Sequence, residues 1–276
     1  MTGRVPAPDS CKRAGVGCLQ RGTFELVAVR SSAAPYLPVD VHDVDALRRA
    51  SAGCHGCPLY EHANQTVFGA GDPHAAVMLV GEQPGDVEDR EGEPFVGPAG
   101  RLLREAMADA GLRVEDAYLT NAVKHFKFER RGKLRLHKKP SAGEVAACAP
   151  WLEAELGAVR PQVVVALGAT AGQALLGPEL RVTRDRGATR PGPHGALVVP
   201  TVHPSSILRA PNHDERAAAA ERFVDELRSV RGLLTSARGR TVRDARDPVS
   251  SAARSGRQSG GAKAPSKPRR PPGSDR

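Results

Sequence analysis

Four short segments carry the side chains that can do chemistry, and each follows an apolar run. These segments are residues 81–97, 121–139, 168–172 and 201–206. They hold one aromatic ring (Phe95), an amide (Asn121) and two histidines (His137 and His203). An amide, an aromatic plate and histidines suit a pocket for a planar ring that forms hydrogen bonds. Each residue alone has an ordinary structural explanation, so their joint placement is what favours a site.

The apolar runs before these segments predict the elements that position them. Expected strands are Ala75–Val80, Tyr118–Val123, Gln162–Leu167 and Ala196–Thr201, and helical patterns cover Gly100–Ala110, Ser141–Leu156, Ala169–Leu176 and Asp214–Leu227. This alternation predicts an α/β fold, a three-layer α/β/α sandwich around a central, mainly parallel four-stranded sheet. Ligands of such folds bind at the carboxyl ends of the strands, which is where the four segments lie.

Charge is distributed unevenly along the 276 residues, whose net charge is +9. Residues 1–35 carry +3 and residues 236–276 carry +8, so the middle of the chain is slightly acidic. Within that middle, residues 124–139 hold eight Lys or Arg against one Glu. A short basic segment on an acidic body favours an anion-binding edge, with nucleic acid as the first candidate. A solvated surface loop is the alternative.

Composition divides the chain into three parts. Residues 1–35 lack periodicity and are expected to form a poorly ordered extension with a short strand at Thr23–Val29. Residues 36–235 form the predicted domain, and residues 236–276 a disordered basic tail. No apolar run approaches the ~20 residues of a membrane span, and the start of the chain lacks a signal-peptide segment. We therefore expect a monomeric cytoplasmic protein without a membrane partner.

Cysteine spacing suggests a metal or redox site. Cys54 and Cys57 form a CxxC pair, which by itself is compatible with redox chemistry, zinc or an iron–sulfur cluster. Cys148 lies in a predicted helix, whereas Cys11 and Cys18 lie in the extension and match no pattern.

The GEQPGDVEDREGEPFVGPAG motif, the strand end at Asn121 and the HPS triplet at 203–205 resemble the uracil-DNA glycosylase superfamily over about residues 36–230. The most similar branch comprises the iron–sulfur family-four enzymes and their X-type relatives. Gln83 and the basic insertion KLRLH at 133–137 favour the X-type branch, which usually reads KRRIH. Leu134 therefore replaces a positive charge.

This resemblance implies a substrate, uracil in single- or double-stranded DNA, and a repair-type reaction that cleaves the N-glycosidic bond. Phe95 would stack on the uracil ring while Asn121 pairs with its polar edge. Other implied uracil or catalytic residues are Gly81, Glu82, Gln83, Asp86 and His203. Implied DNA contacts are Lys133, Arg135, Lys138, Lys139 and Ser205. His203 would stabilise the leaving oxygen, and Glu82 would offset the sugar cation or orient a histidine.

In the X-type branch the resemblance further implies that His137 attacks C1′ and stays bound to the abasic sugar. Neutral imidazole is a competent nucleophile, and nearby cations such as Arg135, Lys138 and Lys139 would favour the neutral form. The protein would then act once and remain as a covalent protein–DNA product.

The family pattern also implies a 4Fe–4S cluster held by Cys54, Cys57, His125 and Cys148, with a structural role. Histidine replaces cysteine in some clusters, and zinc also binds three cysteines and one histidine. Two alternatives to covalent capture remain: a conventional turnover glycosylase of the same fold, or a non-catalytic, metal-stabilised nucleic-acid-binding module.

Overall fold

The centre of the molecule is a mainly parallel sheet. This structure, a computed structural model, describes residues 31–246 and the side chains of residues 31–236. The parallel strands are β2 (Val77–Gly81), β3 (Ala117–Asn121), β6 (Val163–Leu167) and β8 (Leu197–Thr201). Nearly every residue in them is buried, as expected for strands covered on both faces. The predicted fold class and its four strands are confirmed.

Two further strands lie at the edges of the sheet and run antiparallel to their neighbours. They are β1 (Ala70–Gly71) and β7 (Arg190–Pro191), which give the order β1-β3-β2-β6-β8-β7. The sheet therefore has six strands, where the sequence predicted four. A strand of two residues is too short to produce a periodic hydrophobic pattern, so these edge strands left no signal in the sequence.

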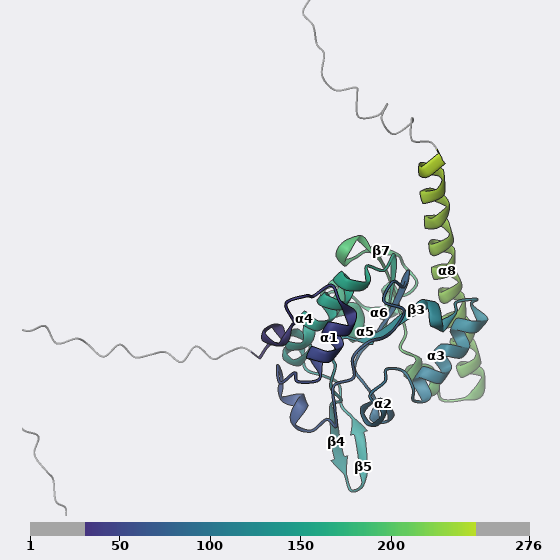
Figure 1. The fold of residues 1–276 in the computed structure, drawn as a ribbon. Coiled ribbons are helices and arrows are strands. Elements are labelled where there is room, and N and C mark those ends of the chain that lie inside the picture. The colour runs from purple at the N-terminus through teal and green to yellow at the C-terminus, as the bar shows by residue number, and fades with distance from the viewer. Residues whose placement is uncertain (1–30, 247–276) are drawn as a thin grey trace, which may run out of the picture. The chain divides into compact units, whose positions relative to one another are not determined.

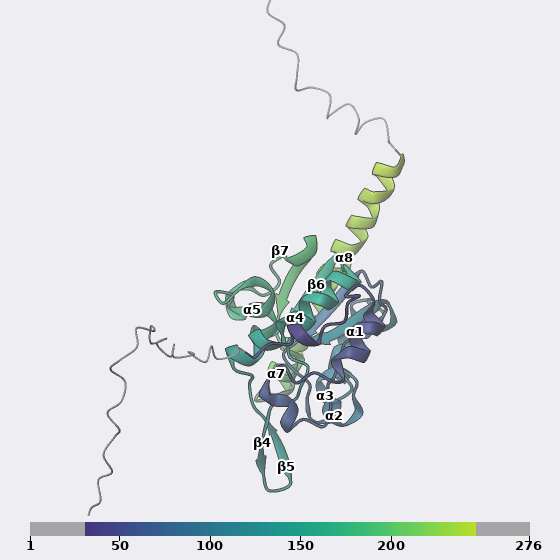
Figure 2. The ribbon, with the colours of Figure 1, turned by 60° about the vertical axis from the view of Figure 1, so that its left-hand side comes forward.

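Helices cover both faces of the sheet (Figures 1 and 2). One face packs against α1 (Val44–Ser51), α4 (Ala142–Val159) and α5 (Ala169–Leu176). The other packs against α3 (Pro98–Asp109), α7 (Pro204–Leu208) and α8 (His213–Arg246). Side chains of β2 alternate between the two layers, with Met78 in the first and Leu79 in the second.

The basic segment is a β-hairpin, whereas the sequence suggested a loop. Its strands are β4 (Phe128–Arg131) and β5 (Leu134–His137), joined through Gly132, which has a φ of 61°. A positive φ suits a tight two-residue hairpin turn. Both views show the hairpin extending away from the sheet (Figures 1 and 2). The remaining short elements are η1 (Ala34–Tyr36), η2 (Pro58–Glu61), α2 (Asp86–Glu91), η3 (Val114–Asp116), α6 (Val182–Asp185) and η4 (Pro193–Gly195).

Both boundaries of the predicted domain shift outward. Ala33 is buried, and its N–H donates to the Ala147 carbonyl of α4 at 2.7 Å, so residues 31–35 belong to the body. Helix α8 continues beyond residue 235 to Arg246. The predicted strand Thr23–Val29, Cys11, Cys18 and residues 247–276 lie outside the described residues. No helix within the described part is long and apolar enough to cross a membrane.

Candidate active site

A cavity of about 690 Å³ opens at the carboxyl ends of the parallel strands. Every predicted catalytic or uracil-binding residue except Gly81 appears in its lining: Glu82, Gln83, Asp86, Phe95, Asn121, His137 and His203. Ser205 and Arg209 also line it. Residues separated by more than 120 positions in the chain therefore meet in one place. The topology brings them together because parallel strands all end at the same edge of the sheet.

Gly81, Asn121 and Phe95 form the tightest part of this cavity. Gly81 and Asn121 are register partners at the ends of β2 and β3. A Cβ atom on Gly81 would lie 2.3 Å from Asn121 Oδ1 and 2.7 Å from Phe95 Cζ, so only glycine fits. Phe95 adopts a φ of 59°, a strained conformation for a bulky residue that places its ring at the strand end. The three residues form a slot beside a carboxamide and an aromatic face.

His203 is held in one tautomer. It caps the N-terminus of α7, and its Nδ1 accepts the Ser205 backbone N–H at 3.1 Å. Burial, together with nearby His137 and Arg209, lowers the pKa of His203 to about 4. A neutral ring whose Nδ1 is an acceptor carries its proton on Nε2. His203 therefore presents an N–H donor, and its ring lies 6.4 Å from that of Phe95 with an interplanar angle of 25°.

His137 lies at the end of β5, and its side chain is half exposed at the cavity. Its Nε2 is 3.4 Å from Glu82 Oε1, and Glu82 also accepts a hydrogen bond from Thr170. Burial lowers the pKa of His137; Glu82 opposes this shift, and Arg209 reinforces it. The imidazole is thus favoured as a neutral base next to a carboxylate.

Arg209 was missed by the sequence analysis. It is exposed at the cavity, and its charge lowers the pKa values of both histidines. The sequence assigned this electrostatic role to Arg135, Lys138 and Lys139. The only sequence signal for Arg209 was its position six residues after His203, which has little weight in an arginine-rich chain.

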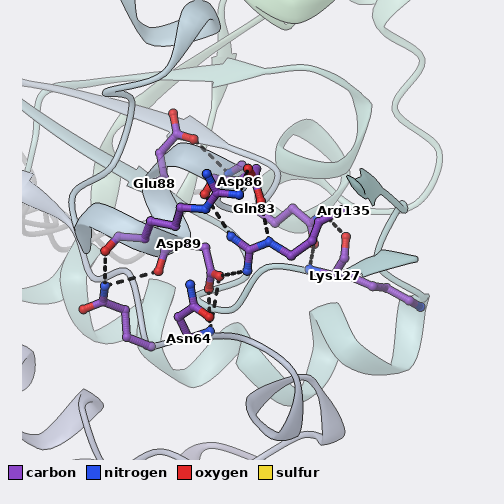
Figure 3. Close-up of polar contacts among 10 residues, drawn as sticks. Asn64, Gln83, Asp86, Glu88, Asp89, Lys127 and Arg135 are labelled. Carbon is purple, nitrogen blue, oxygen red and sulfur yellow. Dashed lines mark hydrogen bonds and ion pairs between the residues drawn. The ribbon is translucent and has the colours of Figure 1, made fainter. Parts of the chain in front are cut away.

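Arg135 does not occupy the position expected of a DNA contact. Its side chain is 7% exposed and forms ion pairs with Asp86 and Asp89, at 2.6 Å from the latter (Figure 3). Its guanidinium also lies over the rings of Phe126 and Phe128, 5.5 and 5.1 Å from their centroids. Because both carboxylates lie in α2, Arg135 fastens the hairpin to the body of the protein. Asp86 is likewise engaged by Arg135 and Arg90.

Gln83 lines the cavity and also holds the hairpin in place. Its carboxamide accepts the Lys127 N–H at 3.0 Å and donates to the carbonyls of Lys127 and Lys138 at 3.2 and 3.0 Å (Figure 3). These contacts engage both amide protons and tie together the two ends of the hairpin. Gln83 therefore sets the position of His137 through the backbone, from within the cavity lining.

Of the other predicted DNA contacts, the three lysines are exposed and Ser205 is half-buried. Lys133 lies in the hairpin turn, and Lys139 follows the hairpin; both are open to solvent. Lys138 is exposed and pairs with Glu129 at 2.7 Å. Ser205 Oγ lies 2.8 Å from His203 Nδ1, so it supports the histidine from within the cavity lining.

Three predicted metal ligands are buried near one another. Burial raises the pKa of Cys148 to about 12, and Cys54 and Cys57 are close enough for a charge on either of them to contribute to this rise. Two N–H groups point at these sulfurs: Trp151 Nε1 lies 3.2 Å from Cys54 Sγ, and the Lys124 amide 3.3 Å from Cys148 Sγ. Such donors stabilise thiolates.

His125, the fourth predicted ligand, has a hydrogen-bonding partner. Its Nε2 lies 3.0 Å from Thr66 Oγ1, and burial, followed by the charge of His55, lowers its pKa to about 4. Among the described residues, no three His, Cys, Asp or Glu side chains are close enough to bind a single ion. The three buried thiols and the imidazole are donor types that both an iron–sulfur cluster and a zinc ion accept.

Comparison with known protein families agrees with this geometry. Residues 68–228 match the model of the uracil DNA glycosylase superfamily. The chain belongs to this superfamily. It is 38% identical over 169 residues to a type-4 uracil-DNA glycosylase of Thermotoga maritima, covering 61% of this chain and 84% of that protein. A type-4 enzyme of Pyrobaculum aerophilum is 35% identical over 178 residues, covering 61% and 86%.

More distant branches of the superfamily match over less of the chain. A type-5 uracil-DNA glycosylase of Thermus thermophilus is 38% identical over 125 residues, covering 40% of this chain and 53% of that protein. The type-4 matches extend further and support the family-four branch. The matched superfamily region, 68–228, contains every residue of the cavity lining and the β4–β5 hairpin that carries His137.

Proposed function

We propose that this protein excises uracil from DNA and is captured on the abasic sugar through His137. The observation that carries the proposal is the position of His137: a neutral imidazole shares one cavity with Asn121, Phe95 and His203 and faces Glu82. A half-exposed nucleophile at the cavity is accessible to the sugar of a nucleotide whose base lies deeper inside.

Uracil recognition rests on the slot formed by Gly81, Phe95 and Asn121. Phe95 provides the stacking face, and the Asn121 carboxamide provides one donor and one acceptor for the O4 and N3–H edge of uracil. Cytosine presents the opposite polarity at that edge, so its binding would leave buried polar groups unpaired. To reach the slot, the nucleotide must flip out of the helix, which costs a few kcal/mol in a duplex.

Bond cleavage is assigned to His203 and Glu82. The C1′–N1 electron pair leaves with uracil, and the Nε2–H of neutral His203 donates to the oxygen that gains negative charge. Glu82 faces the sugar side, where its carboxylate offsets the developing positive charge. The imidazole lone pair of His137 then forms the bond to C1′, and the ring proton of His137 passes to Glu82 or to solvent.

The hairpin supplies the contact to DNA. Arg130, Arg131, Lys133 and Lys139 are exposed along it, and phosphates are their natural partners. Arg135 and Gln83 act inside the protein, holding the hairpin so that His137 reaches the cavity.

We further propose that Cys54, Cys57 and Cys148 hold an iron–sulfur cluster, with His125 as the fourth ligand. When bound, the cluster supplies a structural crosslink between the CxxC segment and α4. Purified protein should be brown and absorb broadly near 400 nm. Stoichiometric zinc without iron after anaerobic preparation would contradict the cluster.

A uracil-containing oligonucleotide tests the function directly. Wild-type protein should form a band that survives denaturation, with about one uracil released per protein. His137→Ser removes the nucleophile and opens space for water, so it should lose the band and release uracil with turnover. His74→Ser, at an exposed loop position outside the cavity lining, is the matched control and should behave as wild type.

The same assay separates the alternatives. Asn121→Ala should abolish both the band and uracil release, because recognition precedes either outcome. Uracil released in excess by wild-type protein without a covalent band would identify a conventional turnover glycosylase. Reversible binding without base loss would identify a non-catalytic module. A full covalent band in His137→Ser would assign the nucleophile to another residue.

A further inference from the structure

A buried ion pair lies directly beneath the uracil slot, and none of the steps above uses it. Lys124 and Glu155 have side chains that are 1% and 0% exposed, and Lys124 Nζ lies 2.5 Å from Glu155 Oε2. Replacing such a pair with apolar residues is often neutral or stabilising, since both charges must be desolvated. Its presence in the core therefore calls for a reason other than stability.

Lys124 bonds to the strand end that carries Asn121. Its Nζ donates to the Asn121 carbonyl at 2.7 Å and to Thr120 Oγ1 at 2.7 Å. The Asn121 carbonyl is the last of β3, and a buried carbonyl requires a donor. Lys124 reaches back three residues to provide it, which fixes the peptide plane from which the Asn121 carboxamide extends.

Glu155 anchors this lysine from α4. Its carboxylate accepts hydrogen bonds from the Gly69 N–H at 3.1 Å, the Tyr118 hydroxyl at 3.1 Å and the Thr120 hydroxyl at 3.0 Å. A Cβ on Gly69 would lie 2.4 Å from this carboxylate, so the chain passes close to it. With the lysine, the carboxylate has partners on every side and holds one position.

We propose that the Lys124–Glu155 pair is a positioning device that sets the orientation of Asn121 toward uracil. This inference rests on the proposed function. Neither residue is in the cavity lining, so each acts through Asn121 and does not contact the base. A fixed carboxamide rejects cytosine more strongly than a mobile one, because a mobile one can turn to exchange its donor and acceptor.

The double variant Lys124→Met with Glu155→Gln tests this. It removes both charges together, and the glutamine oxygen still accepts from Gly69 and Tyr118, so neither residue is left as an unpaired buried charge. The donor to the Asn121 carbonyl is lost. We expect the rate constant of uracil excision under single turnover to fall by at least roughly tenfold, the size expected for losing a charge-assisted hydrogen bond. Inhibition by free uracil should weaken in parallel.

A matched control is Arg190→Met with Asp185→Asn, which removes a charge pair near α6, outside the cavity lining. It should leave excision and uracil inhibition unchanged. Circular dichroism and the denaturant midpoint establish that both double variants are folded. A folded Lys124→Met/Glu155→Gln protein with a wild-type single-turnover excision rate and wild-type inhibition by uracil would overturn the proposal and leave the pair as a purely structural feature.

Thr120→Val keeps the test decisive if the double variant does not fold. Valine has nearly the same shape but removes one acceptor of Lys124 Nζ while retaining both charges. Several-fold weaker inhibition by uracil supports the positioning role, and unchanged inhibition contradicts it. A wild-type protein that neither excises uracil nor is inhibited by it would contradict the proposed function itself. An active wild-type protein whose variants are unaffected would contradict only the positioning role of the Lys124–Glu155 pair.

Discussion

Gly81→Ala tests the uracil slot most directly, because the structure defines what the added methyl group meets. The new Cβ would lie 2.3 Å from Asn121 Oδ1 and 2.7 Å from Phe95 Cζ, where ordinary contacts begin at 3.4 Å. Both side chains must therefore move, Asn121 by about 1 Å. Asn121 and Phe95 are both buried, so neither can move freely.

The size of the effect follows from that displacement. Overpacking a dense site costs about 1–3 kcal/mol, which corresponds to roughly 5- to 150-fold in an equilibrium or rate. A 1 Å misplacement of reacting groups costs on the order of 100-fold. We expect Gly81→Ala to reduce single-turnover uracil excision by about 10- to 100-fold, with little change in DNA affinity, since the hairpin contacts remain.

The measurement is the rate of uracil release from excess protein, together with binding of DNA that lacks uracil. Gly232→Ala is the matched control: its Cβ meets nothing within 4 Å on helix α8, and alanine favours the helix. Wild-type excision by folded Gly81→Ala protein would refute the slot as the uracil site.

Four further predictions concern protonation, the hairpin and the C-terminal segment. Covalent capture needs neutral His137, whose pKa is lowered, so its rate should be constant above about pH 6.5 and fall on acidification; a bell-shaped profile centred below pH 6 would contradict this. The pKa of His203 is about 4 in the folded protein and ~6.5 in the unfolded chain, so the unfolded chain binds more protons between these two pH values. The free energy of unfolding should therefore decline as the pH falls through that range. In a denaturation series at several pH values, His203→Asn should make this decline smaller. Arg135→Met leaves Asp89 buried without its cation and should destabilise by about 3–5 kcal/mol and reduce capture, whereas Arg130→Met at an exposed position should leave the unfolding midpoint unchanged; equal unfolding midpoints for the two would contradict the anchoring role. A chain ending at Arg246 should fold and excise uracil normally while binding DNA more weakly at low salt only; loss of soluble protein would show that residues 247–276 contribute to folding.

Local sequence determined the elements and the outline of the site. Branched apolar runs specified all four parallel strands, and Ser141 with Glu144 specified the start of α4 through a reciprocal capping box, which the structure confirms. The position of Phe95, Asn121, His137 and His203 after strand ends was enough to predict one shared cavity. These features are local or follow from the geometry of parallel sheets, so no tertiary information was needed.

Tertiary structure decided which charged and polar groups face the cavity and which are used internally. Arg135 and Lys133 are two residues apart in one basic run, yet the first is buried against Asp86 and Asp89 while the second is exposed. Likewise, the Gln83 amide bonds to the hairpin backbone, and the charge of Arg209 lowers the pKa values of His137 and His203. Composition cannot tell which side chains face the cavity and which are paired inside the protein, because the partners of each side chain come from distant segments of the chain. These segments meet only when the hairpin, α2 and α7 pack around the sheet.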